Sequence, residues 1–125
     1  MLFTLLVACQ AIGPIFVNYN GVRGDIATWI NQQNFLSMQQ KRSLAQLSRA
    51  QQKLVRIDNI AAQDKVDIAT QNQIAMYCAK RHLSQKKIVQ LQDLVFALVD
   101  QQYISQIYTS TFPQIKLDPQ TIHCD

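Results

Sequence analysis

Cysteine and histidine offer the widest chemistry in this sequence, because thiol and imidazole groups bind metals, form covalent bonds and transfer protons. Cys78 and Cys124 can form a disulfide that closes a loop of 47 residues, counted from one cysteine to the other. His82 lies one helical turn after Cys78, and His123 precedes Cys124, so a zinc site with two cysteines and two histidines is an alternative. Adjacent residues are awkward joint ligands, and no Cys-x-x-Cys motif occurs. We therefore predict the disulfide and no metal site, with zinc ligation or free thiols as the alternatives.

The third cysteine, Cys9, ends an apolar run at the start of the chain. The segment Leu6-Val7-Ala8-Cys9 resembles a lipobox, in which a small residue precedes a cysteine that receives diacylglycerol and becomes the new N-terminus. This resemblance implies a signal peptide over residues 1–8, lipidation of Cys9 and a lipid-anchored linker over residues 9–23. The alternative is that residues 2–17 form an uncleaved anchor or a core helix.

Lipidation of Cys9 implies a bacterial cell envelope protein that is held on a membrane and faces the periplasm. Disulfides persist in that oxidising compartment, which fits the predicted pairing of the other two cysteines. Gln10 follows Cys9, in place of the aspartate that retains many enteric lipoproteins at the inner membrane. We therefore expect the outer membrane rather than the inner one.

Catalytic signatures are missing from the sequence. Nucleophilic catalysis needs a nucleophile, a base and an orienting acid, and only His82 and His123 could act as bases, with no surrounding motif. All three glycines precede residue 25, so no glycine-rich phosphate loop occurs. We predict a protein that is not an enzyme and that carries no cofactor.

The charge is sparse and mildly basic, with twelve Lys and Arg residues against eight acidic residues and a net charge of +4. Lys80, Arg81, Lys86 and Lys87 form a candidate basic surface. Such charge attracts anionic lipid or acidic proteins. No basic motif interleaved with aromatic residues and no recognition helix occurs, so we predict that nucleic acid is not a partner.

Long helices are expected to carry these residues, because no proline lies between Pro14 and Pro113 and no glycine follows Gly24. The first predicted helix begins near Gly24 and carries Trp29, and the second begins at Ser37 with a Ser-x-x-Gln capping box. The third covers residues 63–81. A fourth, over residues 85–108, is predicted to be the central helix because its apolar residues cover more than one face: Ile88, Leu91, Leu94, Val95, Leu98, Val99 and Ile104.

The chain after Thr109 contains Phe112-Pro113 and Leu117-Asp118-Pro119, which are typical of an extended, turning tail. The sequence therefore predicts an all-α domain over residues 24–125. Three to four helices form a small bundle, and an extended tail follows them.

Two family resemblances accompany this fold. Tyr19-Asn20, Trp29 and the segment Leu36 to Gln40 resemble small bacterial lipoproteins of unknown function, in which a lipid-bearing cysteine precedes a Tyr-Asn pair, a Trp-containing helix and a Leu-x-x-x-Gln helix start. The segments Leu36-Ser37-Met38-Gln39-Gln40 and Leu83-Ser84-Gln85-Lys86-Lys87 are similar to the helix-starting repeat of Spy/CpxP periplasmic proteins. The second resemblance implies an ATP-independent chaperone or an envelope stress sensor.

These observations predict a membrane-tethered, non-enzymatic protein-interaction module whose partner is another envelope protein or an unfolded client. A Spy/CpxP-like chaperone or stress sensor is one alternative. A structural accessory subunit of a larger envelope complex is the other.

Overall fold

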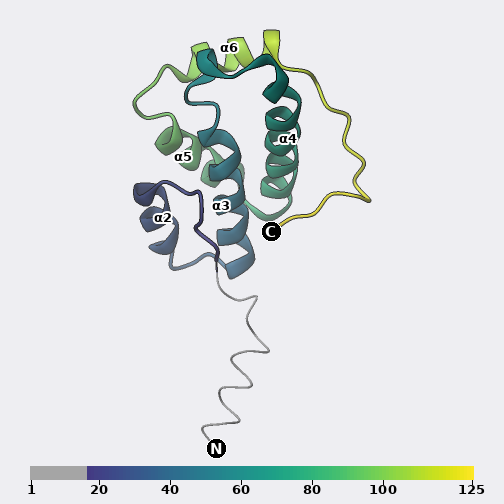
Figure 1. Cartoon of the computed structure of the whole chain (residues 1–125). Helices are drawn as coiled ribbons and strands as arrows, with labels where there is room; N and C mark the ends of the chain where they lie inside the picture. The colour runs from purple at the N-terminus through teal and green to yellow at the C-terminus, as the bar shows by residue number, and fades with distance from the viewer. Residues whose placement is uncertain (1–16) are drawn as a thin grey trace, which may run out of the picture.

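The computed structural model describes residues 17–125, which form five α-helices, two short 3-10 helices and no strand (Figure 1). The predicted signal peptide and Cys9 lie outside the described residues. The elements are, in chain order, α2 (Gly24–Asn31), α3 (Met38–Gln52), η2 (Ile57–Asn59), η3 (Ala62–Asp64), α4 (Lys65–His82), α5 (Gln85–Val95) and α6 (Gln101–Thr111). The all-α prediction is confirmed, whereas three to four helices was an underestimate for this range.

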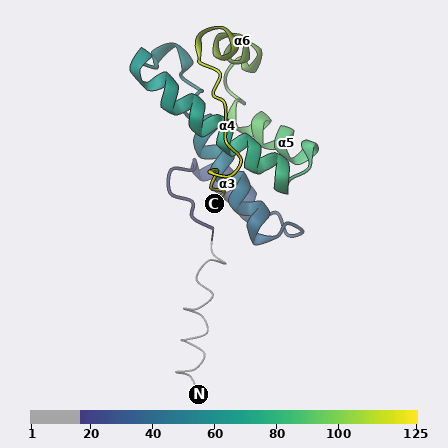
Figure 2. The same ribbon diagram turned by 90° about the vertical axis from the view of Figure 1, so that its right-hand side faces the viewer.

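The centre of the bundle is α3, not the segment 85–108 that the apolar pattern favoured. α4 runs antiparallel beside α3, with a hydrogen bond from Gln40 Nε2 to the His82 carbonyl at one end (3.0 Å). At the other end Gln51 Nε2 donates to Asn72 Oδ1 (3.2 Å). α2 and α5 also pack against α3 (Figure 1). Figure 2 shows α3, α4 and α5 close together in the perpendicular view. Because Ser43 and Ser48 are fully buried on α3, neighbouring helices approach it closely where its side chains are small.

The predicted helix over residues 85–108 is two helices, α5 and α6, separated by a turn at residues 96–100. The Asp100 carboxylate accepts a hydrogen bond from the Tyr103 N–H (3.1 Å) and so starts α6 as its N-cap. At the end of α5, Arg23 from the chain before α2 donates to the carbonyls of Leu94 (2.8 Å) and Val95 (3.2 Å). Leu98 lies in the turn and is 98% exposed, so its expected burial is wrong.

The predicted starts of two other helices are confirmed. Ser37 and Gln40 form a complete capping box, with the Gln40 N–H donating to Ser37 Oγ (3.1 Å) and the Ser37 N–H donating to Gln40 Oε1 (2.9 Å). Ser84 caps α5 by accepting from the Lys87 N–H (3.2 Å). Residues 112–125 contain no helix and form the predicted extended tail.

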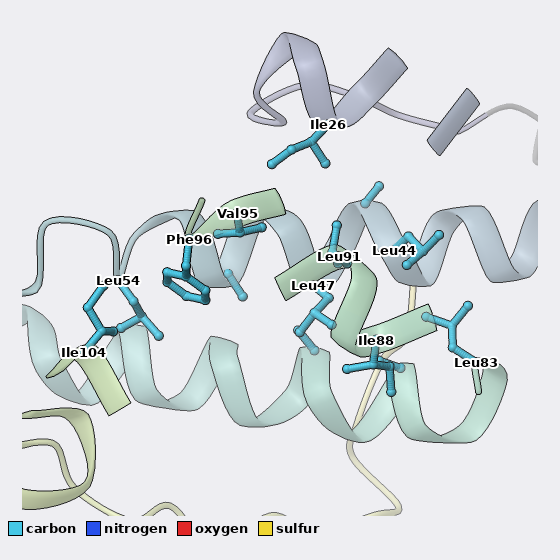
Figure 3. Close-up of a cluster of buried hydrophobic side chains, with 14 of the residues drawn as sticks. Ile26, Leu44, Leu47, Leu54, Leu83, Ile88, Leu91, Val95, Phe96 and Ile104 are labelled. Carbon is cyan, nitrogen blue, oxygen red and sulfur yellow. The ribbon is translucent and has the colours of Figure 1, made fainter. Parts of the chain in front are cut away.

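A single apolar cluster joins the helices (Figure 3). Ile26 points into it from α2, Leu47 from α3 and Ile88 from α5. Phe96 and Ile104 extend it to α6. Four of these five side chains are 5% exposed or less, so each contributes nearly its full apolar surface to the burial that stabilises the fold.

Cys78 and Cys124 are joined in a disulfide with a Cα–Cα distance of 5.6 Å. Cys78 is fully buried on α4, so the bond attaches the extended tail to a rigid helix. Next to it, the Asp125 N–H donates to Gln46 Oε1 (3.2 Å) and Gln39 Nε2 donates to the Asp125 carbonyl (2.9 Å). The end of the tail therefore lies against both α4 and α3.

Candidate functional site

Four helix ends meet at one end of the bundle: the last turns of α2 and α4 and the first turns of α3 and α5. Lys87 Nζ on α5 donates to Gln33 Oε1 just after α2 (2.9 Å). Lys41 Nζ on α3 donates to the Asn31 carbonyl at the end of α2 (3.5 Å). We term this region the basic end and define it by its six cationic residues. They are Lys41, Arg42, Lys80, Arg81, Lys86 and Lys87.

The four cations predicted from the sequence lie at this end but point in different directions. Lys80, Arg81 and Lys86 are exposed, and the Arg81 guanidinium lies 5.9 Å from the centre of the Tyr77 ring. Lys87 is half-buried and its ammonium lies 5.6 Å from the centre of the Trp29 ring. Lys87 therefore faces α2, whereas Arg81 lies back along α4. Lys41 and Arg42 were not included in the predicted surface, because they lie 39 and 38 residues before Lys80 in the sequence.

Charge is unevenly distributed along the bundle. No acidic residue occurs in residues 26–57 or 68–92, which contain all six cations of the basic end. The first turns of α2 and α4, the end of α5 and the turn before α6 are all at the opposite end. That end carries both signs of charge. Its acidic residues are Asp25, Asp58, Asp64, Asp67, Asp93 and Asp100, and its cations are Arg23, Lys53, Arg56 and Lys65. Asp67 and Lys80 also occupy the ends of α4 that the helix dipole favours for their charges.

Two exposed apolar side chains accompany the cations of the basic end. Phe35, in the turn between α2 and α3, is 100% exposed, and Met38, the first residue of α3, is 45% exposed. No sequence pattern singled out Phe35. Its neighbour Leu36 lies in the same turn and packs against the core, so only the tertiary structure distinguishes the exposed residue from the packed one.

A hollow of about 610 Å³ lies along α3 and α4, lined by Arg49, Lys53, His123 and Asp125 among others. Arg49 forms an ion pair with Asp125, and the disulfide one residue earlier holds this part of the tail in place. Zinc ligation by Cys78 and Cys124 would require two thiolates, and the disulfide supplies none. Within residues 17–125 no group of three His, Cys or acidic residues is arranged to hold a metal ion.

The opposite end carries its own polar contacts. The Tyr103 hydroxyl donates to the Asp58 carboxylate (2.7 Å), and this bond raises the pKa of the Tyr103 phenol. Arg23 Nε donates to Asp25 Oδ1 (2.7 Å), which lowers the pKa of the Asp25 carboxyl. Leu98 is exposed nearby in the turn before α6. This end thus combines charged groups with exposed apolar or aromatic side chains, among them Leu98, Val66 and Tyr103.

The residues that carry the lipoprotein resemblance have structural contacts in this fold. Tyr19, Trp29 and Leu36 are each partly buried against the apolar cluster. Burial raises the pKa of the Tyr19 phenol. These three positions are therefore explained by packing of the segments around α2.

Comparison with known proteins finds no protein family whose profile the sequence matches, no curated protein with a matching sequence and no solved structure with a matching fold. None of the helices in residues 17–125 combines the length and the apolar character needed to cross a bilayer.

Proposed function

We propose that this chain is a lipoprotein of the bacterial cell envelope, tethered through Cys9 and facing the periplasm, where its helical domain acts as a non-enzymatic protein-interaction module. The observation that carries the proposal is the Cys78–Cys124 disulfide. Disulfides persist in oxidising compartments and are rare in the bacterial cytoplasm. A lipobox-like segment at residues 6–9 supplies the matching route out of the cytoplasm.

The tether follows from the chemistry of acylation. Each buried methylene contributes about 0.8 kcal/mol, so two or three acyl chains hold a protein on a membrane essentially permanently. Export would also expose Cys78 and Cys124 to oxidation, and their bond then fixes the tail on the domain. The outer membrane is the proposed location, because Gln10 replaces the aspartate associated with retention at the inner membrane.

The interaction role is supported by the exposed apolar side chains. Leu98 and Tyr103 protrude at one end of the bundle, beside a hollow of about 350 Å³ that Val55 and Ile57 help to line. Exposed apolar residues rimmed by charged ones are typical of surfaces that bind other proteins. Asp58, Asp100 and Arg56 line this hollow, so a partner with groups of both charges would complement it.

The tether is tested by labelling cells with radioactive palmitate and measuring the intact mass of the protein from the membrane fraction without reductant. We expect a mass for residues 9–125 with a lipidated Cys9 and two hydrogens fewer than the reduced chain. Cys9→Ser should lose label and membrane attachment, whereas Cys124→Ser should keep both. An unprocessed, fully reduced chain in the cytoplasm would refute the proposal.

The interaction role needs a separate experiment. Crosslinking in intact cells from a photoreactive residue at Leu98 should capture a partner at fixed stoichiometry. The same residue placed at Gln114, exposed in the tail, is the control. Equal crosslinking at both positions would contradict a specific interface.

A Spy/CpxP-like chaperone is the second candidate, favoured by the exposure of Phe35 and Met38 among cations. Holding an unfolded chain requires accessible apolar surface, so the folded protein should bind a hydrophobic dye and suppress aggregation of a model client. Phe35→Ser should reduce both effects. Absence of both in the unsubstituted protein would exclude this candidate.

A further inference from the structure

The first described residues show from which side the chain enters the domain. Val17 and Arg42 line the same small hollow beside the first half of α3. Arg49 Nη1 donates to the Asn18 carbonyl (2.8 Å), and Gln52 Nε2 donates to the Gly21 carbonyl (2.9 Å). Residues 17–23 therefore run along α3 toward its last turn. Val17, the first described residue, thus lies beside the half of α3 that begins at the basic end.

The electrostatics of that end favour an anionic surface. Its six cations come from three helix ends, the first turns of α3 and α5 and the last turn of α4, and the sequence segments that supply them contain no carboxylate. Asp125 lies beside the first half of α3, where Gln39 donates to its carbonyl, and its carboxylate is paired with Arg49. Lys80, Arg81 and Lys86 are exposed, so their charges are available to a flat surface approaching the end of the bundle.

The exposed apolar residues favour a lipid surface over an anionic partner that is bound by charge alone. Phe35 lies two residues after Gln33, which accepts the hydrogen bond from Lys87, so a fully exposed aromatic ring belongs to the same turn that Lys87 contacts. Met38 is the next exposed apolar residue along the chain. Basic residues with aromatic and aliphatic neighbours are typical of surfaces that lie in the headgroup region of a membrane.

We propose that the basic end docks on anionic lipid headgroups, with Phe35 inserted between them and the surrounding lysines and arginines on their phosphates. The orientation rests on the proposed tether, because a lipid on Cys9 would hold this same end near the bilayer. Docking turns the opposite end, with Leu98 and the carboxylates, away from the membrane and toward a protein partner.

A single tryptophan reports which end touches lipid. The chain contains one tryptophan, Trp29, so Trp29→Phe provides a background without tryptophan. Phe35→Trp in this background is the test, and Leu98→Trp is the matched control, because the original residues are 100% and 98% exposed at opposite ends. The full lipidated chain is reconstituted in vesicles with brominated acyl chains, made with or without phosphatidylglycerol.

Bromine quenches tryptophan only within the bilayer. We expect quenching at position 35 when phosphatidylglycerol is present, a marked loss of quenching at high salt or in neutral vesicles, and no quenching at position 98. Three results would each overturn the proposal. They are no quenching at either position, quenching at position 98 only, and quenching at position 35 that does not depend on lipid charge. A response at position 35 to polyglutamate but not to vesicles would instead assign this end to an acidic protein.

Failure of the tether and failure of the docking give different results. If the protein sediments with neutral and anionic vesicles alike but shows no quenching at position 35, the tether is supported and the docking is refuted. If the protein carries no lipid but still binds phosphatidylglycerol vesicles with quenching at position 35, the docking is supported and the tether is refuted.

The charge contribution is measured in the full chain carrying Cys9→Ser, which has no acyl group. Removing one lysine near an anionic bilayer weakens partitioning about fivefold, so replacing the exposed pair, Lys80→Gln with Lys86→Gln, should weaken it about 25-fold. Lys53→Gln with Arg56→Gln removes the same charge beyond the other end of α3 and is the control. An equal loss in both pairs would show that net charge, not this surface, drives binding, and would overturn the proposal.

Discussion

The Cys78–Cys124 disulfide should contribute a large part of the stability of this domain. It closes a loop across a sequence separation of 46 residues, for which the chain-entropy relation gives about 4 kcal/mol of stabilisation. Domains of this size are stabilised by only about 5 to 15 kcal/mol in total, so removal of the bond should bring the fold close to its limit. The perturbation is Cys78→Ala combined with Cys124→Ala.

Urea unfolding followed by circular dichroism measures the effect on the free energy of unfolding. We expect a loss of about 4 kcal/mol and a lower midpoint. The alanine pair also removes the buried Cys78 sulfur, so the unsubstituted protein unfolded with reductant is the control that keeps all side-chain atoms. A slope that changes together with the midpoint would indicate a denatured state that the bond had kept compact.

The outcome that refutes this reasoning is a loss below about 1 kcal/mol on reduction, because the entropy relation would then not apply to this loop. A large loss in the alanine pair without a loss on reduction would assign the effect to packing around Cys78. Hydrogen exchange separates a local effect from a global one. If only residues 112–125 lose protection, the bond fixes the tail and leaves the bundle unchanged.

Three further perturbations test the described contacts. Ser37→Ala removes the hydroxyl that caps α3 and should cost about 1 kcal/mol in urea unfolding, and an unchanged midpoint would contradict the capping role. Leu47→Ala should cost about 2 to 5 kcal/mol because the side chain is fully buried, whereas Leu98→Ala should change stability by less than about 0.5 kcal/mol. Because the Tyr103 phenol donates to Asp58, its pKa lies above the ordinary value, and Asp58→Asn should lower it in an ultraviolet pH titration. A titration curve identical in both proteins would show that this hydrogen bond does not form in solution.

Local chemistry explains which elements could be predicted. The hydroxyls of Ser37 and Ser84 bond to N–H groups three residues away, so the starts of α3 and α5 are encoded within one helical turn. Pro113 and Pro119 similarly exclude a helix from the tail. Asp100 is the N-cap of α6 by the same chemistry, and it lies in a run of apolar residues whose periodicity suggested a continuous helix.

The break at residues 96–100 depends on distant residues as well. Arg23 satisfies the carbonyls at the end of α5 from more than 70 positions earlier in the chain, which no local pattern reveals. The central place of α3 was missed for a related reason. Fully buried serines such as Ser43 and Ser48 look polar in the sequence, and only neighbouring helices make their positions internal.

Only part of the basic end could be predicted from the sequence. Lys80, Arg81, Lys86 and Lys87 were identified because they are close together in the sequence. Lys41 and the exposed Phe35 join them only because antiparallel packing brings the first turn of α3 to the end of α4. The spatial grouping therefore required the tertiary structure.

The sequence by itself determined the helical class, the starts of two helices, the extended tail and the prediction of the cysteine pairing, because these depend on local hydrogen bonding, on proline and glycine, and on redox chemistry. Tertiary structure decided which helix lies at the centre, where the fourth predicted helix breaks, and which charges share a surface. Those outcomes depend on contacts between residues far apart in the chain, such as Arg23 with Leu94, whose energies no single segment contains.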